Sequence, residues 1–289
     1  MATRRVLVVL GGTGFVGRHI CAQAVRGARF DAVYSVSRRG IPPATAATTS
    51  WEHHPCMHWV GQPSEGTLEA LLENAYREKA GTALSVVCSV GALFENEAYK
   101  QFLEEPQNVS PFAGRGSSQT YEFLNRDVCI RAVQSVRSFA EKESTVSSIP
   151  FVFISAHASP PGVDEKYVET KREAERYLLD QAHENSWSGP SKLRPIIFRP
   201  SFIYDESRPA SMHIATGLKL GHVGKTFLSA YFPAPKRLPS LPFGGALEAI
   251  GHSIDECLSA PPVRVTRVAD AAVSAILDEG VSGTFGPNI

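Results

Sequence analysis

The stretch Arg4–Gly17, RRVLVVLGGTGFVG, decides the fold. An apolar run over 6–10 stops at Gly11, and Gly14 and Gly17 follow at three-residue intervals. This pattern predicts a buried strand, a tight turn and the start of a helix. The first glycine lets the chain turn back, the second lets backbone amides approach a pyrophosphate, and the third lets the helix pack on the strand. Because the first amides of a helix attract anions, the sequence predicts a dinucleotide-binding turn.

Composition restricts the function classes. With 289 residues, 43% of them hydrophobic, the chain can bury one α/β core or a core plus a small lobe. Lys plus Arg and Asp plus Glu both number 29, so no net field attracts nucleic acid, and we expect no such partner. No apolar run approaches the roughly 20 residues of a membrane span, so we expect no transmembrane segment. The five scattered cysteines indicate buried thiols in a reducing compartment.

Strand and helix patterns alternate along the chain, which predicts an α/β fold, a doubly wound parallel sheet with helices on both faces. Helices are expected over 15–26, 67–79, 121–141, around 167–175 and over 268–277, and strands over 6–10, 31–37, 57–60, 84–90, 150–155, 195–200, 263–266 and 284–286. We expect a nucleotide-binding domain over 1–204, to which 263–289 return. Residues 205–262 are richer in Pro and Gly, and their stretch AYFPAPKRLPSLPF predicts neither helix nor strand, so we expect a small substrate lobe or lid there.

The end of the second strand indicates which cofactor binds. In a dinucleotide fold, an acidic residue at this position accepts from the ribose 2′-hydroxyl, whereas arginine suits a 2′-phosphate. Arg38 and Arg39 stand there, with no Asp or Glu, which favours NADPH over NADH. Two solvated arginines in a turn are the alternative.

The end of the fourth strand is built of small residues. Ser89, Val90 and Gly91 leave room for a cofactor to pass over the sheet. We therefore place these three residues in the cofactor-binding set.

A tyrosine and a lysine follow the central strand 150–155. Tyr167 and Lys171 are four apart and share a helix face, so the ammonium can lower the pKa of the phenol. Such a tyrosine can exchange protons near neutral pH. The pair alone is common as an aromatic ring resting on a lysine stem, but here the preceding strand ends in Ser155, at the sheet edge where ligands bind.

One cluster has the spacing of metal ligands. If extended, His54, Cys56 and His58 share one face. Pro55 interrupts that strand and no fourth ligand is near in sequence, so we predict no metal site.

In order along the chain, these pieces resemble the short-chain dehydrogenase/reductase superfamily, in its extended or atypical branch. The resemblance rests on GGTGFVG at 11–17, SRR at 37–39, SVGA at 89–92, Asn125, FIS at 153–155, YVETK at 167–171, RPSFIY at 199–204 and VRVTRVADAA at 263–272. It implies a seven-stranded Rossmann core, with the lobe after RPSFIY forming most of the substrate site.

The resemblance also implies roles for individual residues. The pyrophosphate would be held by Gly11, Thr13, Gly14, Phe15, Val16 and Gly17. Arg38 and Arg39 would hold the adenosine end, Lys171 the nicotinamide ribose, while Pro200 and Phe202 would border the nicotinamide. Ser155, Tyr167 and Lys171 would be the catalytic set.

The phrase YVETKREAE, with FISA before it and RPSFIY after it, is similar to a mitochondrial group. That group contains a fungal coenzyme Q biosynthesis protein and the NADPH-binding accessory subunit of respiratory complex I. It implies a mitochondrial protein on the matrix side of the inner membrane, and the first strand begins so near Met1 that we expect no cleavable presequence. Two functions follow as alternatives: an NADPH-dependent oxidoreductase acting on a carbonyl or quinone-like lipid, or a non-catalytic NADPH-binding subunit of a mitochondrial membrane complex.

Overall fold

A single parallel sheet organises the protein. The computed structural model describes residues 4–41, 50–61, 67–77, 82–93, 120–143, 148–160, 163–183, 192–231 and 255–288. Seven strands lie in the order β3-β2-β1-β4-β5-β6-β9, and every pairing is parallel. The strands are β1 (Arg5–Leu10), β2 (Ala32–Ser37), β3 (Met57–Gly61), β4 (Ala83–Cys88), β5 (Ser148–Ile154), β6 (Lys192–Phe198) and β9 (Gly283–Phe285). The predicted doubly wound sheet is confirmed.

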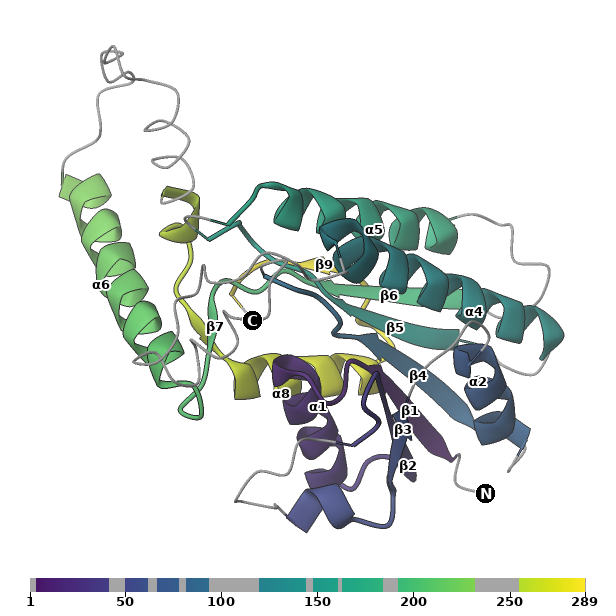
Figure 1. The fold of residues 1–289 in the computed structure, drawn as a ribbon. Helices are drawn as coiled ribbons and strands as arrows, with labels where there is room; N and C mark the ends of the chain where they lie inside the picture. The colour runs from purple at the N-terminus through teal and green to yellow at the C-terminus, as the bar shows by residue number, and fades with distance from the viewer. Residues whose placement is uncertain are drawn as a thin grey trace.

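Helices cover both faces of this sheet (Figure 1). One face carries α1 (Phe15–Arg26) and α8 (Val265–Leu277), and the other carries α2 (Thr67–Arg77), α4 (Val128–Lys142) and α5 (Lys166–His183). A 3-10 turn, η1 (Ser50–His53), precedes β3. Parallel strands buried on both faces read as nearly continuous apolar runs, which is why β1 and β5 were visible in the sequence.

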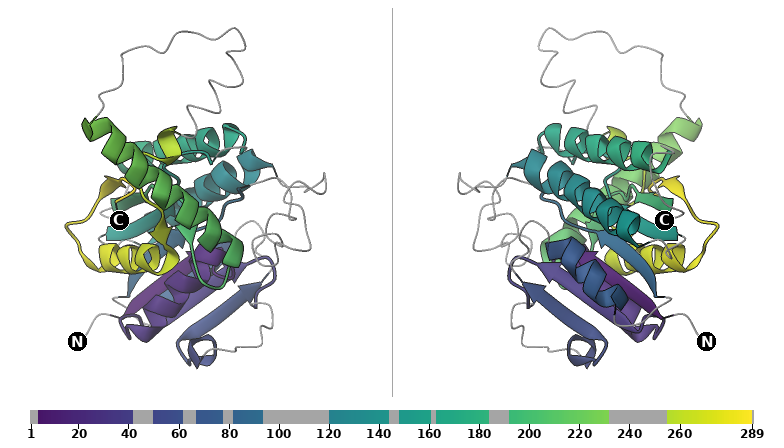
Figure 2. Two further views of the ribbon diagram at one scale, coloured as in Figure 1. Left: turned by 90° about the vertical axis from the view of Figure 1, so that its left-hand side faces the viewer. Right: turned by 90° about the vertical axis from the view of Figure 1, so that its right-hand side faces the viewer.

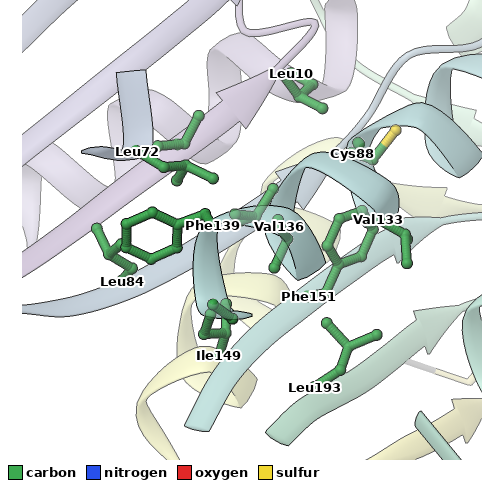
Figure 3. Close-up of a cluster of buried hydrophobic side chains, with 14 of the residues drawn as sticks. Leu10, Leu72, Leu84, Cys88, Val133, Val136, Phe139, Ile149, Phe151 and Leu193 are labelled. Atoms are coloured by element: carbon green, nitrogen blue, oxygen red, sulfur yellow. The ribbon is translucent and has the colours of Figure 1, made fainter. Parts of the chain in front are cut away.

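The core is divided by the sheet into two hydrophobic clusters. Figure 3 shows part of the cluster beneath α4, where Phe139, Val136 and Val133 face strand residues such as Phe151. On the opposite face, α1 buries its predicted inward stripe, Ile20, Cys21, Ala24 and Val25.

Two helices differ from the sequence prediction. The helix expected over 121–141 begins with a π-helical turn, η2 (Glu122–Asp127), before α4. Within the expected irregular lobe, a long helix, α6 (Pro209–Tyr231), lies beyond the carboxyl-terminal edge of the sheet in both views (Figures 1 and 2). Ala230 and Tyr231, the first residues of AYFPAPKRLPSLPF, thus end a helix, and 232–243 lie outside the described residues.

A two-stranded parallel sheet joins the segment after β6 to the chain's return. Its strands are β7 (Ile203–Tyr204) and β8 (Val263–Arg264). From β8 the chain enters α8 and then forms β9 at the sheet edge, in the predicted order. The strand expected over 263–266 ends at Arg264, and the helix expected from 268 already begins at Val265. Of the helices described, none has the length and apolar character to traverse a bilayer.

Candidate functional site

The turn after β1 has the geometry that its glycines predict. Gly11 has φ +81°, its N–H donates to Val36 O at 2.8 Å, and its carbonyl accepts from Gly14 N at 2.8 Å. A Cβ on Gly17 would lie 2.2 Å from Gly11 O, so only glycine lets α1 pack against the turn. The predicted conformations of the first and third glycines are confirmed.

A fourth glycine in this turn is also required by packing. A Cβ on Gly12 would lie 2.2 Å from the Oγ of Ser35 on β2. Sequence reasoning assigned Gly12 no role, because its neighbour is 23 positions away in the chain.

The start of α1 has the features of an anion-binding helix end. Gly14 is extended as the N-cap, and in the described part of the chain no side chain caps this end. The amides of Phe15, Val16 and Gly17 are the first of α1, so they lack carbonyl partners within the helix. Thr13 lies half-buried in the turn, and Gly14 is exposed. These residues fit the diphosphate of a dinucleotide, because the first amide donors and the helix dipole of α1 point to the position of the exposed Gly14.

The segment after β4 lies against this turn. Ser89 Oγ donates to Leu10 O at 2.8 Å, and a Cβ on Gly11 would lie 3.1 Å from both Ser89 and Val90 side-chain atoms. At its other end, a Cβ on Gly91 would lie 3.0 Å from Lys171 Nζ. The predicted cofactor segment 89–91 therefore spans from the glycine turn to the predicted catalytic lysine.

Asn125 fixes that segment from the π-helical turn η2. Its fully buried side chain accepts from Ala92 N at 2.9 Å and donates to Ala92 O at 3.2 Å. Both hydrogen bonds hold backbone, so Asn125 shapes the edge next to Gly91.

Tyr167 and Lys171 lie together on α5, as their spacing predicts. Lys171 Nζ is 5.7 Å from the Tyr167 ring centroid and donates to Ile154 O at 3.0 Å. Burial lowers the pKa of Lys171 to about 8. Charge interactions with Cys88, Cys129 and Glu175 act in the other direction and offset only part of this effect. The Tyr167 ring is half-buried and packs edge-on against Tyr121. A cation beneath a partly accessible phenol is the arrangement that activates a tyrosine.

Ser155 faces a different group. Its buried hydroxyl donates to the Glu175 carboxylate and accepts from Arg172 Nη1 at 3.2 Å. Since a hydroxyl has one hydrogen, Ser155 can orient a substrate carbonyl only by releasing Glu175. Its predicted catalytic role stays a prediction.

Glu175 is the centre of a buried ion-pair network that sequence reasoning missed. Arg172 and Arg199 both donate to its carboxylate, Arg199 Nε at 3.1 Å to each oxygen. Burial alone would raise the pKa of Glu175, but hydrogen bonds from Arg199 and Ser155 and the charges of both arginines hold it below its ordinary value. Only the pairing with Arg172, three residues before Glu175 on the same helix, could have been found from the sequence.

The loop after β6 lies beside the loop after β5. Pro200 O accepts from His157 N at 2.8 Å, and Phe202 O accepts from Val263 N at 2.9 Å. These bonds place Pro200 and Phe202 at the carboxyl edge of the sheet, where the resemblance implies the nicotinamide.

The two arginines after β2 are exposed, at the end of the strand next to the glycine turn. Gly40, with φ +80°, turns the chain behind them against Gly61. The structure places Arg38 and Arg39 at the predicted edge, and their role toward a 2′-phosphate stays a prediction.

The histidine and cysteine cluster is split between two contacts. His54 Nδ1 and Cys56 Sγ lie 3.0 Å apart, whereas the His58 ring stacks on Tyr34 with 4.6 Å between centroids. Within the described ranges, no three His, Cys, Asp or Glu side chains gather as metal ligands would.

Comparison with known proteins places the chain in a family. No protein-family model matches it. MIOREX complex component 2 of Saccharomyces cerevisiae is 30% identical over 243 residues, which are 77% of this chain and 82% of the yeast protein. The chain belongs to the family of that yeast protein. The same comparison finds an uncharacterized chloroplastic protein of Arabidopsis thaliana, 26% identical over 283 residues, which cover 96% of this chain and 74% of the plant protein.

Solved structures of other proteins share the fold of this chain. A short-chain type dehydrogenase/reductase of Mycobacterium ulcerans covers 99% of this chain and 89% of its own, with TM-score 0.55 and 16% identity. A UDP-glucose 4-epimerase of Thermus thermophilus, solved with NAD, covers 98% and 77%, with TM-score 0.51 and 16% identity. The chain therefore has the short-chain dehydrogenase/reductase fold, as the sequence resemblance implied.

Proposed function

We propose that this protein binds a nicotinamide dinucleotide at the carboxyl edge of its sheet and uses it to reduce a carbonyl or quinone-like lipid. One observation supports this most: the glycine turn, the segment 89–91 and Lys171 form a continuous line along that edge. The solved epimerase with the same fold was obtained with NAD, which is in keeping with such a ligand.

The proposed chemistry uses the α5 pair. A bound reduced nicotinamide supplies a hydride. Tyr167 donates a proton to the developing alkoxide oxygen, and Lys171 stabilises the phenolate that remains, since its Nζ lies 5.7 Å from the ring centroid. Lys171 also holds the nicotinamide ribose in this proposal, and Pro200 and Phe202 border the nicotinamide ring. Residues 205–262 then form the lobe over the substrate.

The proposed cofactor is NADPH rather than NADH. Arg38 and Arg39 are exposed after β2, where the 2′-phosphate of a bound adenosine would lie. Replacing both by alanine should weaken the binding of NADPH more than that of NADH in a fluorescence titration. Alanine at the exposed Arg29 should change neither affinity. Equal weakening of both nucleotides would refute the assignment of the 2′-phosphate site.

A second function is favoured by the position of Ser155. Because its hydroxyl donates to Glu175, the substrate-orienting partner of Tyr167 is occupied elsewhere. A protein that holds NADPH without chemistry, as a subunit of a mitochondrial membrane assembly, fits this geometry, and the bound nucleotide would then add to folding stability.

The proposed location is the mitochondrion, peripheral to the inner membrane on its matrix side. The sequence resemblance supports it, and the yeast relative is a component of the MIOREX complex. The coenzyme Q association and the partner subunits belong to the same proposal.

One experiment separates the two functions. Tyr167→Phe removes the proton donor, and Tyr177→Phe on the same helix is its matched control. Loss of NADPH-dependent quinone reduction in the first variant alone, with NADPH binding retained in both, would support the enzyme. If wild-type protein binds NADPH but both variants restore respiratory growth in a deletion strain equally, the non-catalytic function holds.

A further inference from the structure

Arg208, which directly precedes α6, lies over the ring of Phe15, the first residue of α1. Arg208 Cζ is 4.0 Å from the centroid of the Phe15 ring, a close cation–π contact. Arg208 directly precedes α6, so this contact joins the start of the expected lobe to the glycine turn.

The contact is held from both sides. The His19 ring packs edge-on against Phe15, and its Nδ1 lies 2.8 Å from Phe15 O. Asp205 Oδ2 lies 3.9 Å from His19 Nε2, while Asp205 O accepts from Arg208 N at 3.1 Å. The turn that carries Arg208 therefore lies against Phe15 and His19 of α1.

Helix geometry determines where this places the charge. Side chains on an α-helix tilt toward its N-terminus, so the Phe15 ring leans toward the first amides of α1, and the Arg208 guanidinium lies within 4.0 Å of that ring's centroid. A diphosphate bound to those amides would then have the guanidinium of Arg208 on the side away from the helix. Arginine suits this position because a planar guanidinium can stack on a ring and still donate to two phosphate oxygens.

We propose that Arg208 binds the diphosphate of the nucleotide opposite the α1 amides. This inference rests on the proposed nucleotide site and adds a contact from outside the glycine turn. It makes Arg208 a binding residue that couples the start of α6 to an occupied site.

The test compares a nucleotide that has the diphosphate with a fragment that lacks it. Calorimetry would measure Kd for NADPH and for adenosine 2′-monophosphate with the full chain. Arg208→Gln should raise the Kd for NADPH on the order of tenfold or more, because hydrogen bonds to a charged group are lost. The Kd for adenosine 2′-monophosphate should stay unchanged. Arg208→Lys keeps the positive charge but not the planar guanidinium, so its Kd for NADPH should lie between those of the wild type and Arg208→Gln. Arg264→Gln, which removes an exposed arginine paired with Glu206, is the matched control.

Each outcome has one meaning. Equal NADPH affinity in wild type and Arg208→Gln overturns the inference and leaves the proposed function intact. Equal weakening of NADPH and the fragment also overturns it, since the role would then be structural, and thermal unfolding without nucleotide would show the same loss. If wild-type protein binds neither ligand, the proposed nucleotide site itself fails.

Discussion

The Ser155 hydroxyl donates its hydrogen bond to the buried Glu175 carboxylate, so the serine nearest the predicted active site belongs to the structural network beneath it. Arg172 extends that network to the backbone after β5, donating to Ala156 O at 2.8 Å and His157 O at 3.0 Å. These hydrogen bonds stabilise the carboxyl edge of the sheet around Ser155.

Replacing Ser155 by alanine should affect stability more than chemistry. Glu175 keeps both arginines in Ser155→Ala, so we expect a loss of about 1 kcal/mol in the free energy of unfolding, that of one hydrogen bond. Because the one hydrogen of this hydroxyl is donated to Glu175, we expect any reductase activity to remain within about twofold. Urea unfolding and steady-state kinetics on the same preparation measure both. A loss of activity comparable to that of Tyr167→Phe would restore Ser155 to the catalytic set.

Glu175 should make stability depend on acid pH. Its folded-state pKa lies below its ordinary value of 4.5, so its contribution is present above that value and is lost as pH falls through the folded pKa. Glu175→Gln removes this dependence and leaves two arginines without a counter-charge, which should cost about 3 kcal/mol at neutral pH. Urea unfolding of both proteins from neutral to acid pH should show curves that converge in acid. Parallel curves would contradict this role.

Lys171 should make stability depend on pH in the alkaline range, and with the same sign as Glu175 does in acid. Its pKa falls from 10.5 to about 8 on burial, so between these values the unfolded chain binds more protons than the folded one. Stability contributed by this residue therefore rises as pH increases through that window, by up to about 3 kcal/mol. Lys171→Met should abolish the rise, whereas Lys166→Met, at an exposed position on the same helix, should keep it. Identical slopes in the two variants would show that Lys171 is not the source.

Gly12 should be as intolerant of a side chain as the recurrent glycines. In Gly12→Ala the new Cβ would lie 2.2 Å from Ser35 Oγ and 2.8 Å from Ser35 Cβ, and overpacking of this kind costs roughly 1–3 kcal/mol. Ser35→Gly removes both atoms, so the double variant should recover part of that loss. Gly217→Ala on α6 is the control, since a Cβ there meets none of the described residues within 4 Å. Thermal unfolding of the four variants tests this prediction. If the stability losses of Gly12→Ala and Ser35→Gly simply add in the double variant, the two residues do not clash as described.

The glycine turn and α1 could be predicted to the residue because every signal is local. A strand, a positive-φ glycine and an amphipathic helix follow one another within 22 positions of Arg5–Arg26. The pairing of Tyr167 with Lys171 was predictable for the same reason, since helix geometry fixes neighbours four apart.

Other features depend on distant contacts and were missed. The partner of Gly12 is on β2, and the partners of Glu175 come from α5 and from the residues that directly follow β5 and β6. The helix α6 carries Gly217 and Gly221 and has apolar side chains on its exposed as well as its buried side, so neither propensity nor periodicity indicates it.

The most direct test of the account is calorimetric titration of the wild-type protein with NADPH, beside Gly14→Val. In this variant we expect the added side chain to enter the space in front of the first α1 amides, while among the described residues its Cβ meets only Gly11 O, at 3.0 Å. We predict saturable binding of one NADPH per chain by the wild type, and none by Gly14→Val although the variant remains folded by circular dichroism. Absence of heat with both NADPH and NADH in the folded wild type, or unchanged affinity in Gly14→Val, would contradict the account.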